Sequence, residues 1–165
     1  LVDRTEMVEK VAAAARGKKL DENFVLIART DARATEGLEK AIDRAKAYAD
    51  AGADMIFPEA LQDEREFAAF RKAVSVPLLA NMTEFGKSKL LSAQELENLG
   101  YNIVIYPVTS LRLAMKAVEN GLSHIKSEGS QEKILDQMQH RKELYELLRY
   151  EDYNIFDQNI FNFKI

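Results

Sequence analysis

Four apolar segments of this sequence each end in a polar side chain that can bind or polarise a small anion. The polar residues are Arg29, Glu59, Asn81 and Tyr106, in chain order. A short, continuously apolar run is typical of a strand covered on both faces, as in a parallel sheet flanked by helices. Ligands of such folds bind at the carboxyl ends of the strands. We therefore expect a guanidinium, a carboxylate, an amide and a phenol to converge on one rim and to form a site for a small anion.

Arg29 and Glu59 could each serve either binding or structure. Arg29 ends an apolar run and would project its guanidinium from a rigid strand end, where it could bind a carboxylate through two hydrogen bonds. The alternative is a structural ion pair with Asp31 or with Glu59. Glu59 could hold a divalent cation directly or through water, or it could belong to a salt bridge on the rim.

Asn81 and Thr83 place an amide and a hydroxyl at the third strand end, and Gly86 would let this loop approach a ligand closely. The alternative for Asn81 is an Asx turn. Arg112 falls in the first turn of the helix expected after the fourth strand, where the helix N-terminus already favours an anion. Arg141 lies far from any expected strand, so its surroundings in the sequence indicate a surface charge.

The elements expected between these residues repeat a strand followed by a helix four times. The strand ends are 30, 22 and 25 residues apart, which is the size of a βα unit and indicates an α/β fold with parallel strands. We expect strands at 24–29, 55–59, 77–81 and 102–106, and helices at 6–15 with Thr5 as its cap, 35–51, 64–74, 93–99, 110–127 and 131–149.

The pattern changes after residue 128, so we expect 129–165 to form a separate C-terminal helical segment. Its last part, 150–163, alternates aromatic residues with acidic or amide residues. Two interpretations remain open: a last helix that packs on its own domain, or an interface with another subunit.

The composition excludes several classes of function. Hydrophobic residues make up 47% and charged residues 30% of the 165, as in ordinary globular proteins, and a net charge of -4 argues against a nucleic-acid partner. Because no apolar run could span a membrane and charges interrupt the first residues, we expect a cytoplasmic protein without a membrane partner. The absence of cysteine excludes disulfides and thiolate chemistry within this chain, and two histidines exclude a histidine-rich metal site.

Five motifs occur in order along the chain: Ala28–Ala32, Phe57–Ala60, Leu79–Gly86, Tyr106–Pro107 and Gln139–Tyr145. Together they resemble the second half of the 2-methylisocitrate lyases, in the isocitrate lyase and phosphoenolpyruvate mutase superfamily. The resemblance runs from Glu6 to about Tyr150. It implies the C-terminal half of a (βα)8 TIM-type barrel, with four parallel strands and their helices in 1–128, followed by C-terminal helices.

The resemblance also implies an activity: cleavage of the carbon–carbon bond of 2-methylisocitrate to pyruvate and succinate with Mg²⁺, in propionate catabolism. It implies that Arg29 and Glu59 are catalytic, that Glu59 lies near the metal, and that substrate contacts Arg29, Glu59, Asn81, Thr83, Arg112 and Arg141. Arg141 would then bring the helix after the barrel over the rim. The resemblance further implies that the aspartates that hold Mg²⁺, and a flexible loop whose cysteine serves as the acid, would lie upstream of this region. A (βα)8 barrel takes about 250 residues. We therefore expect the C-terminal half of a longer protein, inactive alone.

The partners implied are a small tricarboxylate substrate and either the missing N-terminal half or further copies in a homotetramer, a dimer of dimers. Three arginines at one rim favour a tricarboxylate. Two alternatives remain open: a related superfamily enzyme, of the phosphonopyruvate mutase or oxaloacetate decarboxylase type, and a non-catalytic assembly module.

Overall fold

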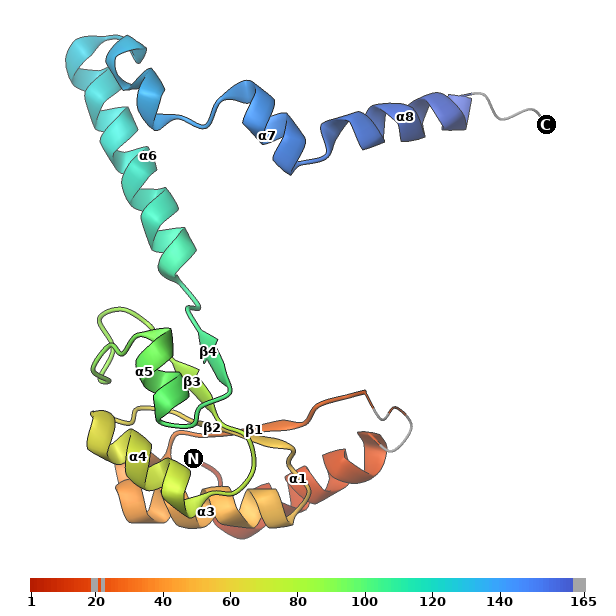
Figure 1. Ribbon diagram of the computed structural model, residues 1–165, viewed down its shortest axis with the longest axis vertical. Coiled ribbons are helices and arrows are strands. Elements are labelled where there is room, and N and C mark those ends of the chain that lie inside the picture. Colours follow the sequence, from red (N-terminus) through yellow and green to blue (C-terminus); the bar gives the residue numbers. More distant parts are fainter. Residues whose placement is uncertain (19–20, 22, 162–165) are drawn as a thin grey trace. The chain divides into compact units, whose positions relative to one another are not determined.

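The computed structural model describes residues 1–18, 21 and 23–161, which belong to two compact units, Leu1–Arg112 and Leu113–Ile165. The first unit contains strands and helices, and the described part of the second contains helices (Figure 1). The units divide after Arg112, near the start of a helix, whereas the sequence analysis placed a boundary after residue 128. The division into a partial barrel at 1–128 and a C-terminal segment at 129–165 stays a prediction. Residues 162–165 of that C-terminal segment lie outside the described residues.

The strands form one parallel layer in the order in which they occur along the chain. Strand β1 pairs with β2 and β3 pairs with β4, both in parallel, and an isolated parallel bridge between Ile56 and Leu78 joins the two pairs. This confirms the expected α/β arrangement with parallel strands. The strands are β1 (Ile27–Thr30), β2 (Met55–Pro58), β3 (Leu79–Asn81) and β4 (Ile103–Ile105).

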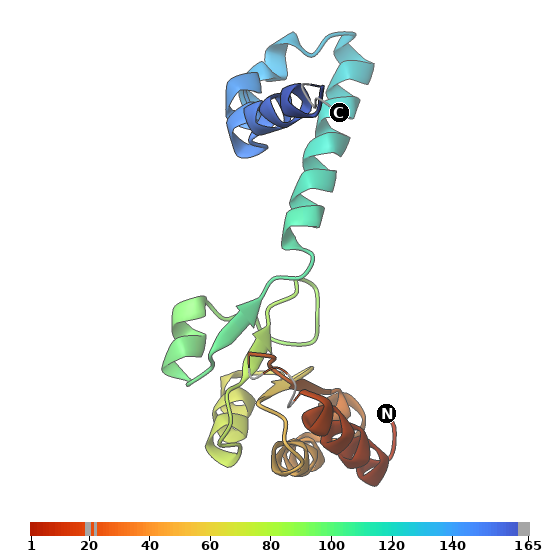
Figure 2. The ribbon, with the colours of Figure 1, turned by 90° about the vertical axis from the view of Figure 1, so that its right-hand side faces the viewer.

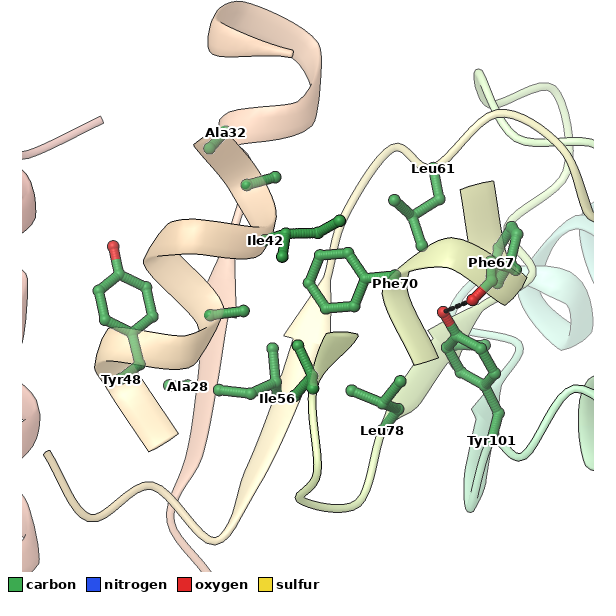
Figure 3. Packing of buried hydrophobic residues seen from close by; sticks show 14 of the residues in the cluster. Ala28, Ala32, Ile42, Tyr48, Ile56, Leu61, Phe67, Phe70, Leu78 and Tyr101 are labelled. Carbon is green, nitrogen blue, oxygen red and sulfur yellow. Dashed lines mark hydrogen bonds between the residues drawn. The ribbon is translucent and has the colours of Figure 1, made fainter. Parts of the chain in front are cut away.

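Helices of the first unit cover one face of this layer. Helix α3 packs on β1 and β2, with α1 and α4 beside it (Figures 1 and 2). The helices are α1 (Arg4–Gly17), α2 (Ala32–Glu36), α3 (Leu38–Asp50), α4 (Glu64–Ala73) and α5 (Ala93–Asn98). Figure 3 shows Ile56 and Leu78 of the layer directed toward Ile42 of α3 and Phe70 of α4. Burial of each such side chain contributes about 1.5–3 kcal/mol, so this face is the core that fixes the strands.

The other face of the layer is unevenly covered. Met55 and Leu79, on the central strands, are buried, whereas Ile27 and Ile103, on the outer strands, are each 39% exposed. Among the described residues, β1 and β4 each pair with one neighbour. Unpaired strand edges favour association with further strands.

Three local expectations for this unit were wrong. Asp3 rather than Thr5 caps α1, because the Asp3 carboxylate accepts the amide of Thr5. Strand β1 begins at Ile27 rather than at residue 24. The single helix expected at 35–51 is two helices, α2 and α3, separated at Gly37, whose φ of 90° is incompatible with a continuous helix. The second helix therefore starts only at Leu38.

The second unit is mostly exposed helix. Helix α6 (Thr109–Glu128) spans the division between the units. The helix expected at 131–149 was also wrong: it is broken into the 3₁₀ helix η2 (Glu132–Gln137) and α7 (Arg141–Leu147), because Met138 and His140 are extended. The aromatic tail forms α8 (Tyr150–Phe161). No described helix is both long and apolar enough to cross a membrane.

Candidate active site at the strand ends

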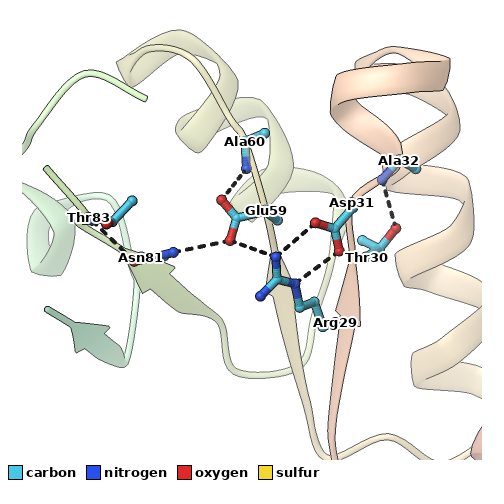
Figure 4. Close-up of polar contacts among 8 residues, drawn as sticks. All are labelled: Arg29, Thr30, Asp31, Ala32, Glu59, Ala60, Asn81 and Thr83. Carbon is cyan, nitrogen blue, oxygen red and sulfur yellow. Dashed lines mark hydrogen bonds and ion pairs between the residues drawn. The ribbon is translucent and has the colours of Figure 1, made fainter. Parts of the chain in front are cut away.

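Arg29 extends from the end of β1 and is held on several sides. Its Nε and Nη2 donate to the Asp31 carboxylate at 2.9 and 2.8 Å, and Nη2 lies 3.4 Å from Oε2 of Glu59 (Figure 4). The guanidinium carbon also lies 5.0 Å from the centre of the Phe57 ring. Both ion pairs that the sequence analysis named as structural alternatives are therefore present.

Glu59 connects the ends of three strands. Its Oε2, beside Arg29, accepts the side-chain amide of Asn81 at 3.1 Å, and its Oε1 accepts the main-chain amide of Ala60 at 3.1 Å (Figure 4). Ala60 has a φ of 63°, a left-handed conformation that is uncommon outside glycine and clusters at functional sites. The Glu59 side chain is only 19% exposed, so these partners leave it little freedom.

Asn81 uses both ends of its amide. Its Nδ2 makes the bond to Glu59, and its Oδ1 accepts the main-chain amide of Thr83 at 3.1 Å. The second bond is the Asx turn that the sequence analysis named as the structural alternative for Asn81. Because the turn fixes the amide group, the Asn81 nitrogen is directed toward Glu59. The structure thus brings together Arg29, Glu59, Asn81 and Thr83.

The electrostatics of this cluster limit what it can bind alone. The hydrogen bonds from Arg29 hold the pKa of Asp31 below its usual value, and the same bonds raise the pKa of Arg29. One guanidinium faces two carboxylates, of Asp31 and Glu59, which leaves a net charge of -1. An anionic ligand would therefore need at least one more cation at the rim.

Arg112 forms a second cluster in the same unit. Its Nη1 donates to the main-chain oxygen of Glu84 at 2.6 Å and to Oε2 of the Glu84 side chain at 2.8 Å. The Thr109 hydroxyl donates to the other oxygen of that carboxylate. The Phe85 ring lies over the guanidinium, 5.1 Å from its carbon. Since Glu84 directly follows Thr83, the two clusters share one loop.

Arg141 and Tyr106 complete the set predicted from the sequence. Arg141 begins α7 in the second unit, where it lines an open hollow of about 650 Å³ together with the stacked rings of Tyr145 and Tyr150. Its membership of the rim stays a prediction. Tyr106 follows β4 and is half exposed.

The sequence analysis did not assign a role to Glu84, Phe85 or Phe57. Each of them contacts a rim arginine, directly or through its ring. The sequence could have indicated Glu84, because it is an acidic residue in the same loop as Asn81 and Thr83, which were predicted to bind substrate.

A metal ion finds no ready set of ligands in the described part of the chain. No group of three or more histidine, cysteine or acidic side chains is placed to hold one. Asp31 and Glu59 both pair with Arg29, whereas Mg²⁺ requires near-octahedral oxygen ligands. These residues alone do not fit a Mg²⁺ site, and a water-mediated contact of Glu59 with a metal stays a prediction.

Comparison with known proteins identifies the class to which this fold and rim belong. The phosphoenolpyruvate phosphomutase family matches residues 1–126, and the chain belongs to that family.

Within this class the chain is a homologue of the 2-methylisocitrate lyases. It is 60% identical, over 164 residues, to the probable 2-methylisocitrate lyase 1 of Corynebacterium glutamicum, a match that covers 99% of this chain and 54% of the relative. It is 52% identical to the 2-methylisocitrate lyase of Bacillus subtilis, covering 97% of this chain and 52% of that one. The chain therefore spans about half the length of these curated relatives.

Solved structures of the superfamily show the same fold. Oxaloacetate acetylhydrolase in complex with 3,3-difluorooxalacetate aligns with a TM-score of 0.87 at 30% identity, covering 100% of this chain and 56% of that one. A 2,3-dimethylmalate lyase aligns at 0.84 and 29% identity, covering 97% and 56%. A phosphonopyruvate hydrolase in complex with oxalate and Mg²⁺ aligns at 0.81 and 30% identity, covering 96% and 56%.

Proposed function

We propose that this chain is the carboxylate-binding half of a 2-methylisocitrate lyase, an enzyme that splits 2-methylisocitrate into pyruvate and succinate. The observation that carries the proposal is the hydrogen-bonded row from Arg29 through Glu59 to Asn81 across three parallel strand ends, in a chain 60% identical to a probable lyase of this kind. A row of this kind presents donors and one cation at the end of a rigid sheet, where ligands of such folds bind.

The chemistry of the cleavage explains the types of residue required. Loss of the hydroxyl proton places negative charge on the oxygen that becomes the keto oxygen of pyruvate. Breaking the carbon–carbon bond then moves that charge to the succinate fragment, where a carboxylate delocalises it as an enolate until a proton is added. Arg29 serves the pyruvate end through the donors of its Nη1, which Asp31 leaves unused. Thr83 offers its hydroxyl and Asn81 its amide to one succinate carboxylate. Arg112 and Arg141 supply the extra positive charge that the Arg29 cluster lacks.

The proposed enzyme needs protein that this chain does not contain. Four parallel strands, of which β1 and β4 each pair on one edge only in the described part of the chain, are half the strands of a (βα)8 barrel. Closing the barrel would pair the free edges of β1 and β4 with further strands. The half of the relatives that this chain does not span is the partner that would close it. The ligands for a Mg²⁺ would come from that half too, so the 165 residues alone have no lyase activity.

A second candidate is a related superfamily reaction on another small oxo or hydroxy acid. The observation that favours it is the structural match to oxaloacetate acetylhydrolase and to phosphonopyruvate hydrolase, at 30% identity each. The higher identity to the 2-methylisocitrate lyases and the number of arginines favour the tricarboxylate. A panel of substrates separates the two candidates.

Complementation tests the proposal. The chain is co-expressed with the N-terminal half of the Corynebacterium glutamicum relative, and pyruvate release from 2-methylisocitrate is measured with Mg²⁺ and with EDTA. We expect Mg²⁺-dependent release from the complemented protein and none from either half alone. Release from the 165 residues alone, or release from oxaloacetate or phosphonopyruvate in preference to 2-methylisocitrate, would contradict the proposal.

A further inference from the structure

The two arginines of the first unit present different edges to a ligand. A guanidinium binds a carboxylate most strongly through two parallel N–H donors, such as Nε and Nη2. In Arg29 this pair is occupied by Asp31. In Arg112 the hydrogen bonds to described residues come from Nη1 alone, which leaves the Nε and Nη2 edge open.

The residue that creates this difference is Glu84. It binds Arg112 twice, through its main-chain oxygen and its carboxylate, and both bonds take the same nitrogen. Its second carboxylate oxygen accepts the Thr109 hydroxyl at the start of α6. The loop after β3 is thereby fixed to the helix that carries Arg112. The Glu84 side chain is 24% exposed and that of Arg112 is 42% exposed, so the carboxylate is the more enclosed partner.

Phe85 covers one face of the same guanidinium. Its φ of 60° is left-handed, which is unfavourable for a bulky residue, and the residue is 95% exposed. Burial does not explain an exposed ring in this conformation, and the contact that the ring makes is a cation–π contact with Arg112. Glu84 thus holds the Arg112 guanidinium at Nη1, and the Phe85 ring covers one of its flat faces.

We propose that Glu84 is a positioning residue that holds Arg112 with its Nε and Nη2 edge open to a carboxylate of the substrate. The inference deepens the proposed function and rests on it for the identity of that carboxylate. Glu84 does not touch the substrate; it fixes the direction from which Arg112 binds. Arg29, with its paired edge closed by Asp31, contacts the substrate only through Nη1.

The order of the Arg112 side chain is the first test, and it requires no activity. In the 165-residue chain, ¹⁵N relaxation of the Arg112 Nε–H is compared among wild type, Glu84→Gln and Glu84→Ala, with circular dichroism as the check of folding. We expect an ordered Nε–H in wild type and, in both variants, the motion of a solvated arginine. Glu64→Gln is the matched control, because Glu64 pairs with Lys89 at the other end of the same loop. An Arg112 that stays ordered in Glu84→Gln would overturn the proposal.

Kinetics of the complemented protein are the second test. In Glu84→Gln, Arg112 is no longer held in position and its charge-assisted contact with the substrate carboxylate is weakened. KM for 2-methylisocitrate should then rise about 10-fold or more while kcat stays nearly constant, because Arg112 binds a carboxylate present in both ground and transition states. A purely structural role would lower the amount of active protein and leave KM unchanged, which would contradict the proposal. If the wild-type complemented protein releases no pyruvate, the proposed function fails, and the relaxation measurement still decides the role of Glu84.

Discussion

Replacing Arg29 by methionine separates its structural role from its proposed catalytic role. Methionine keeps an apolar stem beside Phe57 and removes the charge. The bonds to Asp31 join side chains about half exposed, 52% and 49%, and such surface pairs contribute about 0–1 kcal/mol. Glu59, more enclosed, loses a contact of 3.4 Å and keeps those from Asn81 and Ala60. The unfolding free energy should therefore fall by only about 1 kcal/mol.

The loss of activity should be much larger. Removal of one donor aimed at developing charge costs about 10²–10³ in kcat, or about 3–4 kcal/mol of transition-state stabilisation. Urea unfolding of the variant chain and pyruvate release by the complemented variant measure the two quantities separately. Arg65→Met, which removes an exposed arginine from α4, is the control and should change neither. A loss of activity no greater than the loss of stability would refute a catalytic role for Arg29.

Two further predictions concern the scaffold. The Lys18 side chain and the main-chain amide of Leu26 both donate to the Asp54 carboxylate, and these bonds lower the pKa of Asp54. The ionised carboxylate therefore stabilises the fold fully above about pH 4, and this stabilisation is lost as the pH falls through the lowered pKa. In Asp54→Asn, the free energy of unfolding measured with urea should fall less steeply as the pH is lowered below about 4. Asp50→Asn, at an exposed position, is the control and should keep the wild-type pH dependence. A wild-type pH dependence in Asp54→Asn would contradict this prediction. Tyr101→Phe removes the buried hydroxyl that donates to the Phe67 carbonyl at 3.2 Å and should cost about 1–2 kcal/mol in the same assay; no loss would mean that water replaces the bond.

The parallel layer and its rim could be predicted from the sequence because the relevant signals are local. Each strand is a short apolar run, and each run ends in a polar residue, so the positions of Arg29, Glu59 and Asn81 at strand ends follow from chain direction alone. The structural alternatives that the sequence offered, the Asx turn at Asn81 and the ion pairs of Arg29 with Asp31 and Glu59, are both present, and the binding roles of these residues stay predictions.

Other features depend on contacts that the sequence does not display. The break at Gly37 requires a positive φ that the apolar spacing of 35–51 conceals. The arrangement of Arg112 depends on Glu84, 28 residues earlier, and no spacing rule connects them. Hydrophobic periodicity also could not show that Met138 interrupts the expected helix at 131–149, since the break is a local backbone change in an exposed segment.

Ligand mapping on the complemented protein tests most directly whether the strand ends form the carboxylate site. With only the 165-residue half ¹⁵N-labelled, pyruvate and succinate are titrated together in the presence of Mg²⁺, and amide shifts are recorded. The account predicts saturable shifts at Arg29, Ala60 and Thr83, and none at Asp54, which precedes β2 at the opposite end of the layer. Shifts confined to the Asp54 end, or no saturable shift at the rim, would contradict it.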